Sequence, residues 1–232
     1  MNALRAKIAS LFIKRSFRRF SAFDWKHINP HFSQFGEDAS LLHMFLDKKK
    51  GFYVDVGAFH PAMHSNTHVF YKNKGWRGIN IDPNAEHIKL FEKHRKRDIN
   101  LHTAISDTED ELTYYRFKEG AINSLSKEYA DELIKGGATP LPSEKIKTQR
   151  LENVLEKHLP EGQTIDFMSV DCEAHDLKVL KSNDWERFRP TILLVEDHAG
   201  KEKSEIAQYC EDIGYEMINW VGLTKFFRDT RA

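Results

Sequence analysis

The sequence predicts an α/β protein with a mostly parallel seven-stranded sheet, helices on both faces, and an antiparallel hairpin at the C-terminal end. Short apolar segments of strand length alternate with helical patterns along most of the 232 residues. The last helical pattern, over about residues 202–213, leads into two strand-like segments at 215–221 and 224–228 around Gly222. A polar residue follows each core strand, as expected where the carboxyl ends of parallel strands form a ligand site.

The first strand is expected over residues 52–56, which are rich in aromatic and β-branched side chains. It breaks at Gly57, and residues 65–67 (Ser-Asn-Thr) supply N-cap chemistry for a helix starting near residue 66. A strand, a glycine turn and a helix form the first unit of a nucleotide-binding α/β fold. Asp55 stands out, because a buried carboxylate needs partners such as turn N–H groups or the ammonium group of a ligand.

The other elements follow from the same patterns. A helix opened by residues 33–38 has the expected apolar face Leu41, Leu42, Phe45 and Leu46. Asn84 is expected to cap the helix after the second strand. Residues 108–164 are expected to be an insertion, with an extra strand at 112–117, a Gly- and Pro-bearing loop at 136–142 and a short helix at 151–159. Further core strands are expected at 76–82, 99–105, 164–170 and 191–195.

The charge is unevenly distributed, although the net charge is zero. Residues 1–20 carry six Lys and Arg residues and no acid, so we divide the chain into a basic N-terminal arm (1–32) and a main domain (33–232). The apolar run within the arm is too short to span a bilayer, and the arm lacks a signal-peptide cleavage site. It is a candidate for contact with a membrane surface, with the domain or with a second copy in a homo-oligomer. Its basic and apolar residues do not segregate onto separate faces, which favours the last two.

Composition also indicates the cellular compartment of the protein and the partners that it is expected to have. The two cysteines, Cys172 and Cys210, have no metal-type spacing and indicate a reducing cytoplasm, with peripheral membrane contact left open. Nucleic acid is a poor candidate partner, because basic residues cluster only in the arm and the rest of the chain is mildly acidic.

Two of the polar strand ends suggest nucleoside recognition. Asp82 lies 25 residues after Gly57, near the spacing of about 20 expected for an acid that accepts hydrogen bonds from ribose hydroxyls. Its alternative role is that of a turn residue that caps the next helix. Ser106 and Asp107 follow the third strand, where an adenine amino group would be bound, and their alternative is a solvated turn.

Five segments stand in the same order as the predicted strands. They are Ser-Gln-Phe-Gly-Glu-Asp (33–38), Val-Asp-Val-Gly-Ala (54–58), Gly-Ile-Asn-Ile-Asp-Pro (78–83), Ala-Ile-Ser (104–106) and Ile-Asp-Phe-Met-Ser-Val-Asp-Cys-Glu (165–173). Together these segments resemble the FkbM family of S-adenosylmethionine-dependent methyltransferases over residues 33–200. The resemblance implies a class I methyltransferase (Rossmann-like) fold, S-adenosylmethionine as methyl donor, and O-methylation of a hydroxyl, often on a sugar, glycan or natural product.

The resemblance implies a donor site over the first three strands. Two departures from the family pattern are His60-Pro61 and Ala174, each in place of a usual glycine. Asn66 or Ser65, at a helix N-terminus that attracts anions, could replace backbone contacts to the donor carboxylate. The expected donor-binding residues are Asp55, Gly57, Ala58, Asn66, Asp82, Ser106 and Asp107.

The acceptor is expected at the ends of the fourth and fifth core strands. An alcohol must lose its proton as it is methylated, which requires a carboxylate or histidine within hydrogen-bond reach. Asp171 or His198 is favoured as the base, and Glu173 as an orienting or sugar-binding group, with His175 beside them. Each of these residues could instead have a structural hydrogen-bonding role.

A divalent metal is considered but not favoured. His64 and His68 are four residues apart, so one helix could present both to an ion, near His60 and with Asp171 or Asp197 completing the site. The helix, however, is expected to start between them. No metal ligands are therefore predicted.

Two other functions remain open. A nicotinamide-dependent sugar oxidoreductase would use the same sheet, but the chain lacks G-x-G-x-x-G and has the terminal hairpin. A non-catalytic binding module is also conceivable, and the presence of Asp55, Gly57 and Asp82 argues against it.

Overall fold

The computed structural model describes residues 31–200 and 204–231, which belong, apart from His31, to one structural unit. The basic arm expected over residues 1–32 falls almost entirely outside the described residues and stays a prediction. Among the described residues, no helix is both long enough and apolar enough to cross a membrane.

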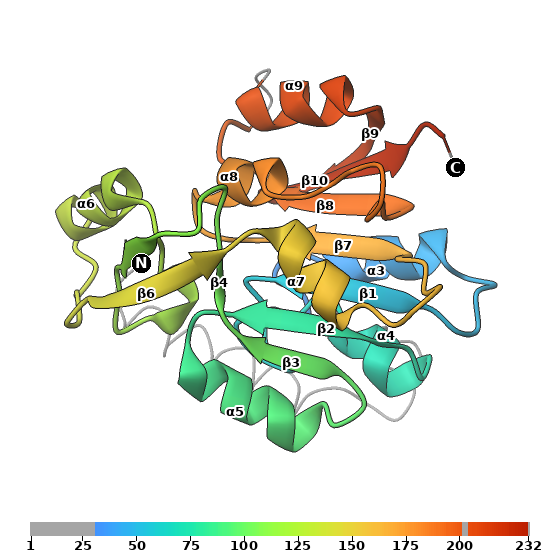
Figure 1. Ribbon diagram of the computed structural model, residues 1–232, viewed down its shortest axis with the longest axis horizontal. Helices are drawn as coiled ribbons and strands as arrows, with labels where there is room; N and C mark the ends of the chain where they lie inside the picture. The colour runs from blue at the N-terminus through green and yellow to red at the C-terminus, as the bar shows by residue number, and fades with distance from the viewer. Residues whose placement is uncertain (1–30, 201–203, 232) are drawn as a thin grey trace, which may run out of the picture. The chain divides into compact units, whose positions relative to one another are not determined.

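The seven-stranded sheet has the order β3-β2-β1-β7-β8-β10-β9 (Figure 1). The first five strands run parallel, and β10 lies antiparallel between β8 and β9. This confirms the predicted mostly parallel sheet with its C-terminal antiparallel hairpin. The strands are β1 (Phe52–Val56), β2 (Arg77–Asp82), β3 (Ile99–His102), β7 (Phe167–Val170), β8 (Ile192–Glu196), β9 (Tyr215–Val221) and β10 (Thr224–Asp229).

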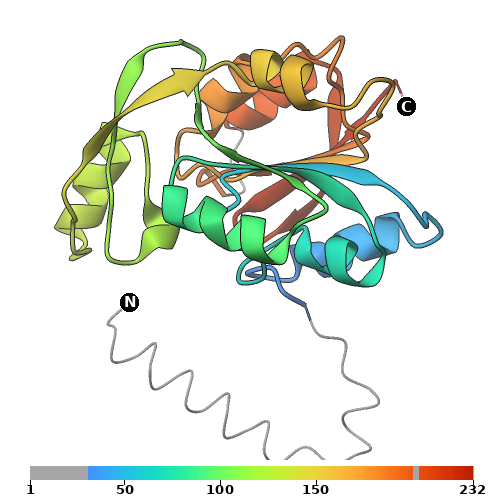
Figure 2. The same ribbon diagram turned by 60° about the horizontal axis from the view of Figure 1, so that its bottom comes forward.

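Helices cover both faces of the sheet, as Figure 2 shows edge-on. One face carries α7 (Leu151–His158), α8 (Asp176–Lys181) and α9 (Glu205–Asp212). The opposite face carries α3 (Glu37–Met44), α4 (His68–Asn73) and α5 (Ala85–His94). The sequence predicted these layers from the regular alternation of strand and helix.

The two apolar cores follow from the alternation of side chains along β1. Phe52, Val54 and Val56 pack into the core under α7 and α8. Tyr53 points the other way, into an aromatic core that includes Phe70 and Trp76. Asp55 shares the face of Tyr53, which places its carboxyl on the side of α3 and α4.

The inserted region forms a second, three-stranded sheet with the order β4-β6-β5. Its strands are β4 (Ala104–Ile105), β5 (Glu111–Tyr114) and β6 (Glu144–Gln149), and it also carries α6 (Lys127–Lys135) and a short 3₁₀ helix (Gly120–Ile122). Figure 1 shows β6 and α6 on the left, the end toward which the arrow of β2 points. The insertion therefore stands beside the carboxyl ends of the core strands.

Three local predictions need correction. The strand expected over 99–105 is divided, because the chain leaves the main sheet after His102 and Ala104–Ile105 pairs with β6 instead. The helix expected near residue 66 starts at His68, whose N–H donates to Ser65 Oγ. Leu46 is 69% exposed, because α3 ends at Met44 before its apolar face reaches that residue.

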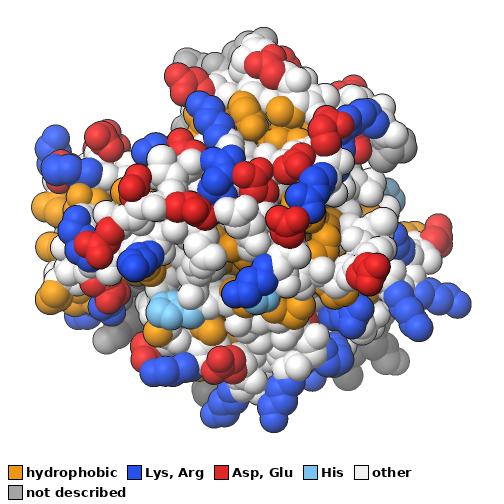
Figure 3. All heavy atoms as spheres, in the orientation of Figure 1, with side chains coloured by type: hydrophobic (Ala, Val, Ile, Leu, Met, Phe, Trp, Pro, Cys, Tyr) orange, Lys and Arg blue, Asp and Glu red, His pale blue; other side chains and the backbone are white. Residues whose placement is uncertain are grey.

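Charged side chains of both signs cover the face drawn in Figure 3. Acidic and basic groups alternate across the region of α7 and α8, with small groups of apolar atoms between them. Lys and Arg side chains gather along the lower edge, near α5, which itself contains Lys89 and Lys93.

Candidate active site

A cleft with about 530 Å³ of empty space, part of it open to solvent, lies at the carboxyl ends of β1, β2 and β7. In open α/β sheets this is where ligands bind. The structure brings together five of the predicted site residues on the walls of this cleft. These are Gly57, Asp82, Asp171, Glu173 and His175.

Gly57 shapes the turn between β1 and the cleft. Its φ of +82° is left-handed, and a Cβ atom at this position would lie 1.7 Å from the backbone oxygen of Asp171. Its N–H donates to Ile81 O at 2.9 Å, so the turn is also bound to β2. Only glycine lets the loops after β1, β2 and β7 meet this closely.

The Asp82 carboxylate is held by three donors. Oδ2 accepts from Phe59 N–H at 2.8 Å, and Oδ1 accepts from Asn84 N–H at 2.7 Å and from His87 Nδ1 at 3.0 Å. His87 Nε2 accepts from the Asn84 side-chain amide at 3.1 Å, which places the imidazole proton on Nδ1. Since an ionised carboxylate has about four acceptor positions, one position of Asp82 stays available to a ligand.

Asn84 caps α5 as predicted, with its side chain accepting from Glu86 N–H. The cap and the Asp82 contacts share the same turn. The two roles considered for Asp82, helix-turn residue and ligand acceptor, are therefore compatible in one geometry.

The end of β4 contributes a buried polar chain. His175 Nε2 lies 3.1 Å from Ser106 Oγ, which donates to Asp107 Oδ1 at 3.2 Å. Burial lowers the pKa of His175 to about 4, so its imidazole is neutral at neutral pH. His175 lines the cleft. Ser106 and Asp107 do not line the cleft, and Ser106 contacts it through His175.

Four carboxyl groups gather where β7 and β8 end: Asp171, Glu173, Asp176 and Glu196. Burial, together with the charges of Glu196 and Glu173, raises the pKa of Asp171 well above its usual value. Burial and the Glu196 charge raise the pKa of Glu173 to about 7, although Tyr129 Oη donates to Glu173 Oε2 at 2.7 Å. The cluster therefore binds protons more tightly than isolated carboxyl groups do.

His198 faces this acidic cluster. Its Nε2 lies 3.1 Å from Glu196 Oε2, and the hydrogen bond to Glu196 raises the pKa of His198 to about 9. The imidazole is thus protonated at neutral pH and has no free lone pair for taking a proton. Of the two groups favoured as the base from the sequence, Asp171 fits that role better.

Besides Ser106 and Asp107, three more expected donor-site residues do not line the cleft. Asp55 accepts from Thr67 Oγ1 at 2.9 Å, and burial raises its pKa to about 6. The Asn66 amide donates to Ser169 Oγ at 3.0 Å. Ala58 is buried, and its N–H donates to Ile81 O at 3.1 Å. All three hold the loop after β1 in place.

Arg95 organises the same loop and was not anticipated. It is 1% exposed, and its guanidinium donates to Pro61 O at 2.7 Å and 2.9 Å, to Ser65 Oγ at 3.1 Å and to Tyr53 Oη at 3.0 Å. Because Ser65 is occupied in this way, it is not free to replace a missing backbone contact to a ligand.

The histidine pair considered for a metal is not assembled as expected. His64 has a left-handed φ of +55° and precedes α4, so it cannot share a helix face with His68. His68 Nδ1 lies 2.8 Å from Pro61 O, and His60 Nδ1 accepts from two backbone N–H groups. Asp197 is bound to Lys225 at 2.8 Å.

The insertion supplies cleft residues that the sequence did not reveal. Tyr114, Asn123 and Ser124 line the cleft, and Ser124 Oγ donates to Glu173 O at 2.6 Å. Tyr129, on α6, binds the Glu173 side chain. A signal for α6 was present, because the Ser126 side chain caps it and an acid follows in the first turn.

The sheet order, the terminal hairpin and the cleft over the carboxyl ends of the strands together define a class I methyltransferase. The comparison with known proteins agrees: the sequence matches the methyltransferase FkbM domain over residues 55–217, well over half of the chain. The chain belongs to this family, as the resemblance of its motifs implied, and the match decides against a nicotinamide-dependent oxidoreductase.

A curated relative supports the assignment over a shorter stretch. The chain is similar to methyltransferase sdnD of Sordaria araneosa, with 32% identity over 108 residues. This match covers 43% of the present chain and 40% of the relative.

Proposed function

We propose that this methyltransferase uses S-adenosylmethionine to methylate a hydroxyl oxygen of a sugar, a glycan or a related small molecule. The observation that carries the proposal is the Asp82 carboxylate, which lines the cleft, is fixed by three donors and keeps one acceptor position unused. A ribose hydroxyl is a donor suited to that position.

The residues present fit this donor. Asp82 lies in the same cleft as Ile105 and Tyr114, which offer apolar surface for an adenine base. His175 is neutral and buried, so it can hydrogen-bond a base without adding charge. When bound, S-adenosylmethionine supplies an electrophilic methyl group on a sulfonium centre.

The acidic end of the cleft suits a hydroxyl acceptor. Glu173, held by Tyr129, accepts hydrogen bonds from sugar hydroxyls. Asp171 takes the proton that the acceptor oxygen loses as it receives the methyl group. Because the displacement is in-line, orientation of the acceptor by these groups supplies much of the rate acceleration.

The place of the reaction in the cell is part of the same proposal. A cytoplasmic enzyme acting on glycan precursors would benefit from membrane contact through residues 1–20, and the alternative is that the arm binds the domain or a second copy. Flotation with anionic vesicles at low and high salt, comparing the full chain with one starting at Phe23, separates these roles.

Labelled donor and a panel of sugars, glycan precursors and other hydroxylated small molecules test the reaction. We expect label in a methyl ether of at least one acceptor, and Asp171→Asn to lower turnover by about 100-fold or more while donor affinity stays within about threefold. Asp184→Asn, a change in a turn outside the cleft lining, is the control. Failure to bind the donor, or wild-type turnover in Asp171→Asn, would contradict the proposal.

A further inference from the structure

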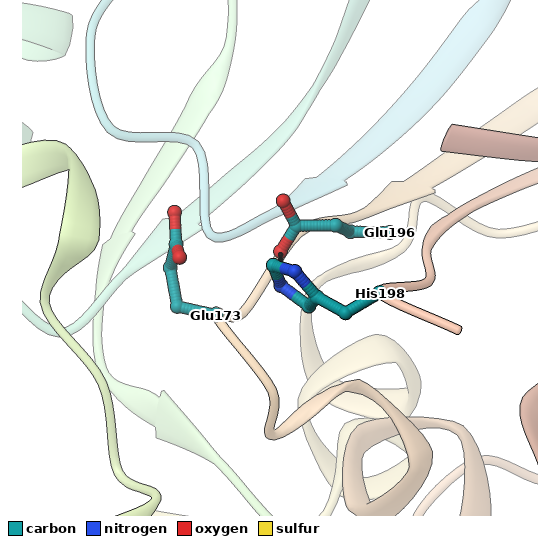
Figure 4. A group of neighbouring side chains, drawn as sticks. All are labelled: Glu173, Glu196 and His198. Carbon is teal, nitrogen blue, oxygen red and sulfur yellow. Dashed lines mark hydrogen bonds and ion pairs between the residues drawn. The ribbon is translucent and has the colours of Figure 1, made fainter. Parts of the chain in front are cut away.

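We infer that Glu173, Glu196 and His198 form a binding site for a divalent cation beside the methyl-transfer cleft. Each residue offers one ligand atom, and the three atoms lie within 4.8 Å of one another. Figure 4 shows the Glu173 carboxyl on one side and the hydrogen-bonded pair of Glu196 and His198 on the other, directed toward a common space.

The spacing suits one ion after a small adjustment. A cation about 2.1 Å from each ligand atom requires those atoms to lie no more than about 4.2 Å apart. Side-chain shifts of less than about 1 Å therefore close the site. Glu173 and His198 are in loops that follow β7 and β8, and their partial exposure permits such shifts.

The carboxylates around the site have no Lys or Arg side chains among the described residues to balance their negative charge. The ion pairs among the described residues give no Lys or Arg partner to Asp171, Glu173, Asp176 or Glu196, and the ion-pair partner of Glu196 is His198. Several carboxylates this close require protons or a cation in order to remain buried.

Asp176 gives an independent indication of a missing partner. The residue is 1% exposed, and its Oδ2 has no hydrogen-bond partner, although Oδ1 accepts from Cys172 N–H at 2.8 Å. The carboxylates whose charges act most strongly on Asp176 are Glu196 and Glu173. The unpartnered oxygen thus belongs to the same electrostatic cluster, where a nearby cation would compensate it.

The donor set indicates the class of ion. Two carboxylates and one imidazole suit Mn²⁺ or Zn²⁺, whereas Ca²⁺ and Mg²⁺ sites are built chiefly from oxygen. The ion would take the place of the proton that His198 carries in the ion-free cluster, and that proton would be released on binding. Tyr129 Oη supports the Glu173 ligand in the way that outer hydrogen bonds orient metal ligands. The His198 side chain is 37% exposed, and Glu173 lines the cleft, so coordination positions remain for water or an acceptor oxygen.

The role of the ion rests on the proposed O-methylation. An acceptor hydroxyl bound to the cation becomes more acidic, which eases its loss of a proton to Asp171. The new bond joins the acceptor oxygen to the methyl carbon as the carbon–sulfur bond breaks, and the hydroxyl proton passes to Asp171. The cation is not consumed and changes no oxidation state.

Titration of the metal-stripped full-length protein with Mn²⁺, followed by calorimetry and electron paramagnetic resonance, tests the site without any acceptor. We expect one saturable site, with affinity at least tenfold weaker in Glu196→Gln and in His198→Gln. The matched controls Glu161→Gln and His43→Gln change exposed residues elsewhere and should bind Mn²⁺ as the wild type does. His198→Gln changes a partly exposed side chain, so it provides a folded test even if Glu196→Gln is unstable.

The outcomes separate this inference from the proposed function. No saturable Mn²⁺ binding, or unchanged affinity in a folded His198→Gln variant, overturns the metal site, whereas donor binding and methylation in the presence of a chelator leave the O-methyltransferase proposal standing. Conversely, specific Mn²⁺ binding without donor binding supports the metal site and overturns the proposed function.

Discussion

Replacing Asp82 by asparagine tests the donor site most directly. The side chain keeps its shape, and its remaining oxygen can still accept from Asn84 N–H, but the carboxylate charge is lost and the new amide nitrogen cannot accept from Phe59 N–H. A hydrogen bond to a charged group contributes about 1.5–3 kcal/mol. At about 1.4 kcal/mol for each tenfold change, the affinity for S-adenosylmethionine should fall between about 10-fold and about 150-fold.

Isothermal titration calorimetry with S-adenosylmethionine and S-adenosylhomocysteine measures this loss. Both should weaken equally, because the contact is to the ribose that they share. Asp184→Asn is a matched control, since Asp184 also accepts from two backbone N–H groups, at 3.0 Å and 3.3 Å. The control should lose some stability and no donor affinity. Affinity within twofold of the wild type in a folded Asp82→Asn protein would refute the assignment.

Two further predictions concern stability. Burial raises the pKa of Asp55 from 3.8 to about 6, so its contribution to stability is present at low pH and is lost as the pH rises through about 4 to 6. In the Asp55→Asn variant this pH-dependent loss of stability should be absent. The free energy of unfolding of the variant, relative to that of the wild type, should therefore increase by about 2–3 kcal/mol between pH 4 and pH 8, as measured by urea unfolding. A difference between the two proteins that does not change with pH would contradict the raised pKa of Asp55 as its cause. Ala174→Gly should stabilise the protein by about 1 kcal/mol, because Ala174 has a left-handed φ of +66°. Thermal melting checks this, with Ala207→Gly in α9 as a destabilising control, and a lower melting temperature for Ala174→Gly would show that the loop is not strained.

The core of the fold could be predicted because its signals are local. A short apolar run, a glycine that the turn requires and an N-cap lie next to one another in the sequence, as around Gly57 and Asn84. The terminal hairpin was equally local, and the strand Tyr215–Val221 has the predicted bounds. Asp82 could be singled out from its spacing to Gly57 alone.

The insertion was not predictable in this way, because its structure depends on pairing between distant segments. Strand β6 carries Lys145, Lys147 and Gln149, so it has no apolar run, and its antiparallel pairing with the distant strand β5 helps to define it. Its parallel pairing with β4 also takes Ala104–Ile105 away from the main sheet.

Several site contacts were hidden for the same reason. Asp197 directly follows Glu196, the last residue of β8, but Lys225 from β10 binds it and removes it from the candidate metal ligands. His87 reaches Asp82 only once α5 has formed. Arg95 depends on the folded positions of Pro61 and Tyr53, which lie 34 and 42 residues away in the chain.

The separate pairing of the inserted sheet has a consequence for how such enzymes diversify. Its strand β4 bonds to β6 and not to the main sheet, so changes in length between Phe117 and Pro140 leave the register of the seven strands untouched. The segment that contributes Asn123 and Ser124 to the cleft wall can thus vary during evolution, while the part of the cleft that contains Asp82 stays the same. Chimaeras that swap this segment between relatives should keep the same donor while accepting different hydroxyl compounds.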